Sequence, residues 1–147
     1  MFKHILIPTD GSELAGKAID AGLQLAKALG AKVTAYHAIE APEVQGVGDE
    51  AFIATTSIRE FVTRLRQRGE SYLAPVRQAA EAAGIACEML VTQPATPHQG
   101  IIEAANDRKC DVILMASHGR GDFASLLLGS VTHKVLAHSK IPVVVFR

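Results

Sequence analysis

The sequence contains no tryptophan, and aromatic residues make up only 5% of its 147 residues. Proteins that bind single-stranded nucleic acid stack the bases on exposed aromatic rings. A base-stacking platform, or a large aromatic cleft for sugars, is therefore not expected in this chain.

Net charge and long apolar runs are also absent. Lys plus Arg (15) balances Asp plus Glu (15), so the chain as a whole is not attracted to a nucleic-acid backbone or an anionic membrane. No apolar run approaches the ~18 residues of a membrane span, and the three aliphatic residues before Pro8 are too few for a signal peptide. We expect no nucleic-acid partner and no membrane partner.

Cysteine is scarce. Cys87 and Cys110 are the two cysteines, and neither has a Cys-x-x-Cys partner. Paired cysteines are typical of oxidising compartments. The sequence therefore predicts two reduced thiols in a cytoplasmic protein.

Along the chain, segments with a strand-like hydrophobic pattern alternate with segments with a helical one. Aliphatic, β-branched segments without strict polar alternation predict strands buried on both faces, as in a parallel sheet. Between them lie helical repeats, the first with Ser12 as N-cap and Gly30 as terminating residue. The order predicts one α/β domain over residues 1–147, a doubly wound five-stranded parallel sheet with helices on both faces. The expected strands are Ile5–Ile7, Val33–Ile39, Ile85–Val91, Val112–Ala116 and Ile141–Phe146, and the expected helices span 13–29, 58–83, 97–107 and 130–138.

The region around the second helix has two open interpretations. Residues 40–57 hold four acids, two glycines and no basic residue, which indicates a mobile surface loop or, alternatively, a lid over a ligand. Pro75 is expected to kink or divide the helix that follows. The arginines of that helix are interpreted as a solvated face, with a docking patch for an acidic partner as the alternative; they are Arg59, Arg64, Arg66, Arg68 and Arg77.

The turn after the first strand is a candidate site because ligands of doubly wound sheets lie beyond the carboxyl ends of the strands. Here the strand ends in Pro8-Thr9-Asp10, and Gly11 and Ser12 turn the chain into the helix. The Asp10 carboxylate can accept hydrogen bonds from ribose hydroxyls or hold a hydrated metal. It can equally cap the turn through the backbone N–H groups that follow, and the sequence leaves both open.

Small residues and glycines also follow the fourth strand, from Met115 to Thr132. Gly119 provides conformational freedom, and Arg120 can add positive charge. Gly129 and Ser130 open the last helix, whose first N–H groups and dipole predict an anion site. A glycine-rich turn before an ordinary helix is the alternative.

Two fingerprints are incomplete. The Walker A spacing that starts at Gly11 ends in Ala18, where Mg²⁺ binding needs Ser or Thr, and its Gly-Lys pair falls within the predicted helix. The dinucleotide-like Gly119-x-Gly121-x-x-Ala124 lacks an acid after the next strand. Neither a P-loop nor a dinucleotide oxidoreductase is expected.

Catalytic and metal-binding patterns are weak. The six histidines have no metal-site spacing, and only His118, inside the glycine loop, is expected to meet a ligand. No Ser-His-Asp order and no carboxylate pair can be argued from spacing. Hydrolytic chemistry is therefore not predicted.

The two loops, on this alternation of strands and helices, resemble the universal stress protein family, whose fold is of the adenine nucleotide alpha hydrolase-like type. The matching segments are residues 5–12, 110–120, 129–131 and 141–145. Nucleotide-binding members of that family carry Gly-x-x-Gly, nine residues, then Gly and Ser or Thr. Gly119, the nine residues after it and Gly129-Ser130 fit this pattern, whereas Ala116 replaces the first glycine.

The resemblance implies a protein that binds ATP, with Mg²⁺ as counter-ion, as a cytoplasmic stress-response sensor or regulator and at most a slow ATPase. It also implies a homodimer through the last strand, Ile141 to Phe146. One alternative is a protein-interaction module of the same fold that does not bind nucleotide because of Ala116; another is an enzyme that acts through Asp10 and His118. The nucleotide-binding residues that the resemblance implies are Pro8, Thr9, Asp10, Ala38, Met115, Ala116, Ser117, His118, Gly119, Arg120, Gly129, Ser130 and Val131.

Overall fold

The strands form one parallel sheet. The computed structural model describes residues 1–41, 49–120 and 127–147, with side chains described from residue 57 onward in the second segment. The five strands are β1 (His4–Pro8), β2 (Lys32–Ala38), β3 (Cys87–Thr92), β4 (Val112–Ala116) and β5 (Val143–Phe146). They pair in the order β3-β2-β1-β4-β5, every pair parallel. The predicted five-stranded parallel α/β fold is confirmed.

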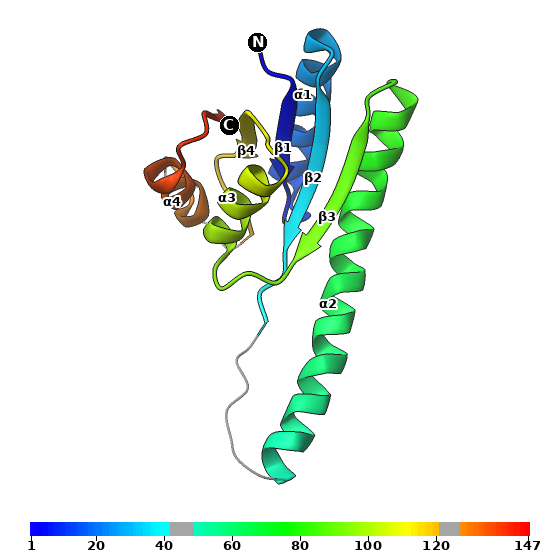
Figure 1. The fold of residues 1–147 in the computed structure, drawn as a ribbon, viewed down its shortest axis with the longest axis vertical. Coiled ribbons are helices and arrows are strands. Elements are labelled where there is room, and N and C mark those ends of the chain that lie inside the picture. The colour runs from blue at the N-terminus through cyan, green and yellow to red at the C-terminus, as the bar shows by residue number, and fades with distance from the viewer. Residues whose placement is uncertain (42–48, 121–126) are drawn as a thin grey trace.

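Helices cover both faces of this sheet (Figure 1). Helices α1 (Glu13–Leu29) and α2 (Asp49–Ala82) pack on one face with Ile5 and Ile7. Helices α3 (Pro97–Asp107) and α4 (Ser130–His138) pack on the other with Leu6. Successive strand side chains point to opposite faces, so an uninterrupted aliphatic strand supplies both cores.

Helix α1 has the predicted ends. The Ser12 hydroxyl accepts a hydrogen bond from the Ala15 N–H at 3.2 Å, and Gly30 takes a left-handed conformation with φ +63°. Its buried stripe includes Ala18, the position that ends the Walker A-like spacing. The Gly-Lys pair of that spacing therefore lies within a helix and cannot wrap around phosphates.

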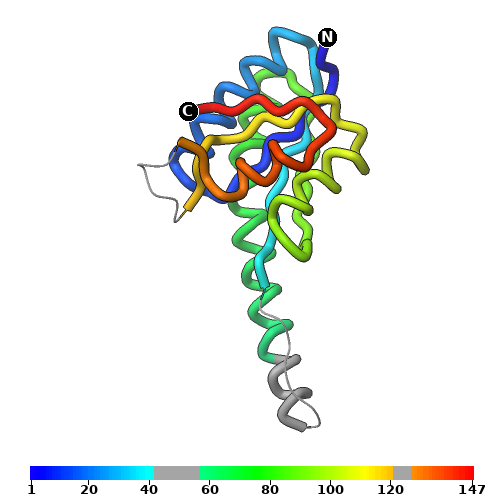
Figure 2. The backbone as a smooth tube through the Cα atoms, turned by 90° about the vertical axis from the view of Figure 1, so that its left-hand side faces the viewer, coloured from blue at the N-terminus to red at the C-terminus, as the bar shows by residue number. Residues whose placement is uncertain are grey.

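Helix α2 differs from the prediction. It begins at Asp49, so residues 49–57 are helical rather than loop, whereas residues 42–48 lie outside the described part of the chain. Its first half extends away from the sheet as an arm (Figures 1 and 2). Pro75 does not divide the helix. The position is exposed, so water can satisfy the carbonyl that a proline ring leaves without its N–H partner.

The bounds of β3 and β5 also differ from the prediction. β3 runs from Cys87 to Thr92 rather than from 85 to 91, and β5 begins at Val143 rather than at Ile141. The Ile141 N–H bonds the Ser139 hydroxyl at 3.0 Å instead of a strand. Pro142 has no N–H and contributes only its carbonyl, which accepts from the Ile113 N–H at 2.9 Å.

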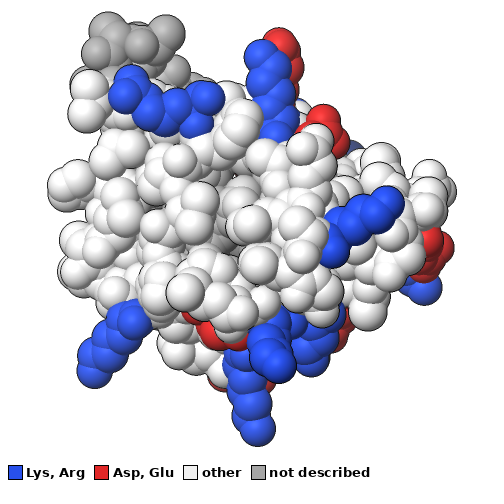
Figure 3. Space-filling view, turned by 90° about the horizontal axis from the view of Figure 1, so that it is seen from above, with Lys and Arg blue, Asp and Glu red and all other residues white. Residues whose placement is uncertain are grey.

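Charge is dispersed over the end of the molecule opposite the arm. There, Lys and Arg side chains are spread around the rim, and several lie beside Asp or Glu (Figure 3). Among the described residues, no helix is both long enough and apolar enough to cross a membrane.

Candidate functional site

A pocket of about 460 Å³ lies at the carboxyl ends of the strands. The centre of the sheet pairs β1 with both β2 and β4, so the strand order reverses there. Crevices of doubly wound sheets form at such a reversal. The predicted site residues that line the pocket are Pro8, Thr9, Asp10, Ala38, Met115, Ala116, His118, Gly119, Arg120, Ser130 and Val131.

The Asp10 carboxylate joins the two loops of the pocket. One oxygen accepts the Ser12 N–H at 2.9 Å, as in an Asx turn, and the other accepts the Arg120 N–H at 2.6 Å. Burial by itself would raise the pKa of Asp10, but the hydrogen bonds from Ser12 and Arg120 outweigh it and lower that pKa. Asp10 therefore caps the turn, which is one of the two interpretations that the sequence left open, and the ribose or metal role stays a prediction. Asp10 also holds the loop after β4 in place.

Gly119 allows this close approach. A Cβ atom built at Gly119 would collide with the Asp10 carboxylate oxygen. The next residue, Arg120, also donates from its guanidinium to the Gly11 carbonyl at 3.2 Å. The loops after β1 and β4 are therefore tied by main chain and side chain together.

The start of α4 forms another wall of the pocket. Ser130, Val131 and Thr132 line it, and the first N–H groups of a helix have no intrahelical acceptor and carry partial positive charge. The Thr132 hydroxyl donates to the Ala116 carbonyl at 2.9 Å and fixes the helix against the end of β4. This arrangement suits an anionic group.

Two predicted residues, Ser117 and Gly129, are not among the lining residues. Ser117 is only 2% exposed. Its N–H donates to the Phe146 carbonyl and its carbonyl accepts from the Gly129 N–H, both at 2.7 Å. The two residues therefore place the start of α4 rather than face the pocket, and the Gly129 N–H is already used.

Helix α2 supplies lining residues that the sequence did not reveal. Leu65, Arg68 and Tyr72 line the pocket, and Arg68 is exposed, as the interpretation of a solvated face predicts. Their spacing of three and four marks one side of a helix, a signal that was available in the sequence. The Tyr72 ring meets His37 edge-on, with ring centroids 5.4 Å apart. The His37 Nδ1 atom lies 2.8 Å from the Thr9 carbonyl.

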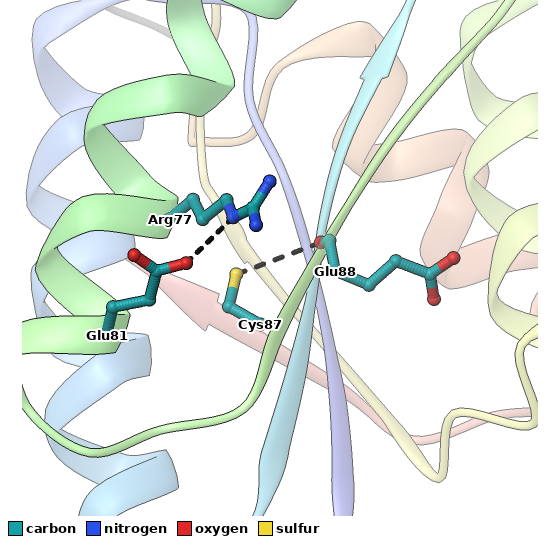
Figure 4. Close-up of polar contacts among 4 residues, drawn as sticks. All are labelled: Arg77, Glu81, Cys87 and Glu88. Carbon is teal, nitrogen blue, oxygen red and sulfur yellow. Dashed lines mark hydrogen bonds and ion pairs between the residues drawn. The ribbon is translucent and has the colours of Figure 1, made fainter.

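The cysteines lie apart from the pocket and are not activated. Cys87 and Cys110 are both free thiols, as predicted. Burial raises the pKa of Cys110 to about 11. Burial also raises the pKa of Cys87, whose thiol lies beside the Arg77–Glu81 ion pair and donates weakly to the Glu88 carbonyl at 3.8 Å (Figure 4). Thiols of this kind are poor nucleophiles.

The fold places the chain in the class of Rossmann-like α/β proteins of the adenine nucleotide alpha hydrolase-like type. The family model described as "Universal stress protein family" matches residues 1–147. The chain belongs to the universal stress protein family.

Relatives match over the whole chain. A universal stress protein of Thermus aquaticus is 33% identical, with all of both chains covered. Universal stress protein MJ0531 of Methanocaldococcus jannaschii is 32% identical, with 100% of this chain and 83% of the relative covered.

Solved structures share the fold. The structure of MJ0577 from Methanocaldococcus jannaschii superposes with a TM-score of 0.81 at 30% identity, covering 99% of this chain and 95% of the other. A universal stress protein in complex with cAMP has a TM-score of 0.69 at 25% identity, covering 99% and 97%. A universal stress protein of Archaeoglobus fulgidus in complex with dAMP shares the fold, with a TM-score of 0.61 at 16% identity over 100% and 98%. Structural neighbours of this chain therefore bind adenine nucleotides.

Proposed function

We propose that this chain is one universal stress protein domain that binds ATP in the pocket at the carboxyl ends of β1 and β4. It would act as a cytoplasmic stress-response sensor or regulator and at most as a slow ATPase. The observation that carries the proposal is the joint lining of one pocket by the Asp10 loop, the Gly119 loop and the start of α4. The adenine nucleotides bound by structural neighbours support it.

The lining residues fit such a ligand. Ala38, Met115 and Val131 offer apolar surface for a base, and the first turn of α4 with the Ser130 hydroxyl offers donors for phosphate. No three His, Cys, Asp or Glu side chains gather as a metal site within residues 1–41, 57–120 and 127–147. Mg²⁺ is bound mainly through phosphate oxygens and water, so we assign it to the nucleotide as counter-ion.

The proposal is tested by equilibrium titration of the purified chain with ATP in the presence of Mg²⁺. Saturable binding is expected, and mass spectrometry of the denatured protein should detect co-purified adenine nucleotide. A complete lack of binding at millimolar ATP would refute the proposal.

A second candidate function rests on Ala116. This residue replaces a motif glycine and lines the pocket, so its methyl group occupies space beside a ligand. The candidate is an interaction module of the same fold that does not bind nucleotide. The Ala116→Gly variant distinguishes the two: binding gained from none supports the interaction module, and strong binding by the wild-type chain rejects it.

We also propose that two copies associate through β5. This strand lies at the edge of the sheet beside β4, and Val144 is 38% exposed. An open aliphatic edge favours pairing with another strand. Light scattering should give the mass of a dimer, and Val144→Lys should shift it toward monomer; a monomeric wild-type chain would refute the pairing.

A further inference from the structure

Two arginines flank one tyrosine on the α2 side of the pocket. Arg68 and Tyr72 are four residues apart and therefore lie on the same side of α2, and both line the pocket. Arg120 comes from the loop after β4, and its guanidinium carbon lies over the Tyr72 ring, 5.3 Å from the centroid. This α2 wall, Arg68, Tyr72 and Arg120, brings together groups far apart in the sequence.

The Tyr72 ring is held from two sides. His37 meets it edge-on. Gly11 packs so closely that a Cβ atom there would lie 2.6 Å from the ring. The ring is therefore a fixed surface for the Arg120 guanidinium, which the Gly11 carbonyl holds at 3.2 Å. A side chain held in this way need not be ordered when a ligand binds.

Both guanidinium groups retain capacity for an anion. Within the described residues, the ion pairs involve neither Arg68 nor Arg120. A guanidinium has five N–H donors, and that of Arg120 donates one hydrogen bond, to Gly11. The nearby Asp10 carboxylate is already bonded by two backbone N–H groups. Guanidinium groups bind phosphate oxygens strongly because the bonds are charge-assisted and often paired.

The start of α4 supplies neutral N–H donors, whereas the α2 wall supplies two full positive charges to the same pocket. We propose that the α2 wall is a subsite for the terminal phosphates of the nucleotide, so that the chain selects nucleoside triphosphate over monophosphate. Arg68 and Arg120 contact those phosphates, and Tyr72 is a positioning residue that acts through Arg120. The inference rests on the proposed function and adds the residues that distinguish nucleoside triphosphate from monophosphate.

The first experiment compares the dissociation constants of ATP and AMP for the full chain. Arg68→Gln is expected to raise the dissociation constant of ATP about tenfold, the effect of one lost charge-assisted hydrogen bond. The dissociation constant of AMP should change by less than about twofold. Arg64→Gln is the matched control, because Arg64 lies on the exposed part of α2 and contacts Glu60 at 4.0 Å. This control should change neither constant.

The second experiment isolates the positioning role of Tyr72. Tyr72→Leu should weaken ATP binding more than AMP binding. Tyr72→Phe keeps the ring and should leave the ratio of the ATP and AMP dissociation constants unchanged. In an Arg120→Ala background, Tyr72→Leu should have no further effect on that ratio, because the residue through which Tyr72 acts is gone. Unchanged urea unfolding midpoints establish that each variant is folded.

The outcomes separate the two proposals. ATP and AMP affinities that are equal in the wild-type chain, or a ratio that survives both Arg68→Gln and Tyr72→Leu, would overturn the α2 wall subsite and leave nucleotide binding standing. Failure of both nucleotides to bind at millimolar concentration would overturn the proposed function itself, and the subsite with it.

Discussion

Asp10→Asn should destabilise the chain, because the two oxygens of this carboxylate accept the N–H groups of Ser12 and Arg120, which belong to loops far apart in the sequence. An asparagine keeps one acceptor oxygen and turns an NH₂ group toward the other N–H donor. One charge-assisted hydrogen bond is lost and the other becomes neutral. Bonds to charged groups contribute about 1.5–3 kcal/mol, so we expect a loss of about 2 kcal/mol, or about 4–8 °C in melting temperature for a chain of this size.

The assay is urea unfolding followed by circular dichroism, with Asp20→Asn as control. Asp20 lies on the exposed side of α1, and its replacement should change stability by less than about 0.5 kcal/mol. The pKa of Asp10 is lowered by folding, so its contribution is complete above the usual value of 3.8 and is lost as pH falls through the lower folded-state pKa. The difference between wild type and Asp10→Asn should therefore shrink in acid. Equal midpoints at neutral pH, or a difference that persists unchanged below the folded-state pKa, would refute the reasoning.

Three further predictions concern the interior. Burial and Lys32 lower the pKa of His4 from 6.5, so the contribution of His4 to the free energy of unfolding should be complete above pH 6.5 and be lost as pH drops through the folded-state pKa. The urea midpoint of His4→Gln should therefore depend less on pH than that of the wild-type chain. Cys110, whose pKa is raised to about 11, should resist iodoacetamide at about pH 8 until the chain is unfolded, and rapid labelling of native protein would contradict this. Leu73 is fully buried between α2 and the sheet, so Leu73→Ala should cost about 2–5 kcal/mol by urea unfolding, and a cost below 1 kcal/mol (about the effect of a surface change) would count against the packing.

The boundaries that the sequence predicted well are those with a local cause. Ser12 and Gly30 end α1 because a hydroxyl cap and a left-handed residue act within one helical turn. Residues 49–57 contain neither glycine nor proline, so they can belong to the helix. The start of α2 was missed because acids and glycines surround this segment, and such a composition resembles a loop. The start of β5 was placed two residues too early because aliphatic character continues through Ile141, whereas strand pairing stops at a proline.

The sequence by itself determined the order of strands and helices and the two loops that meet at the pocket, because periodicity, caps and glycines act over a few residues. Through the family resemblance it also indicated half of the residues that line the pocket. Only the tertiary structure decided that Asp10 binds the backbone N–H of Arg120 and that Ser117 is bonded to Gly129 at the start of α4. It also decided that α2 lines one side of the pocket. Those facts depend on contacts between segments far apart in the chain, and a parallel sheet brings such segments together only when its crossovers have folded.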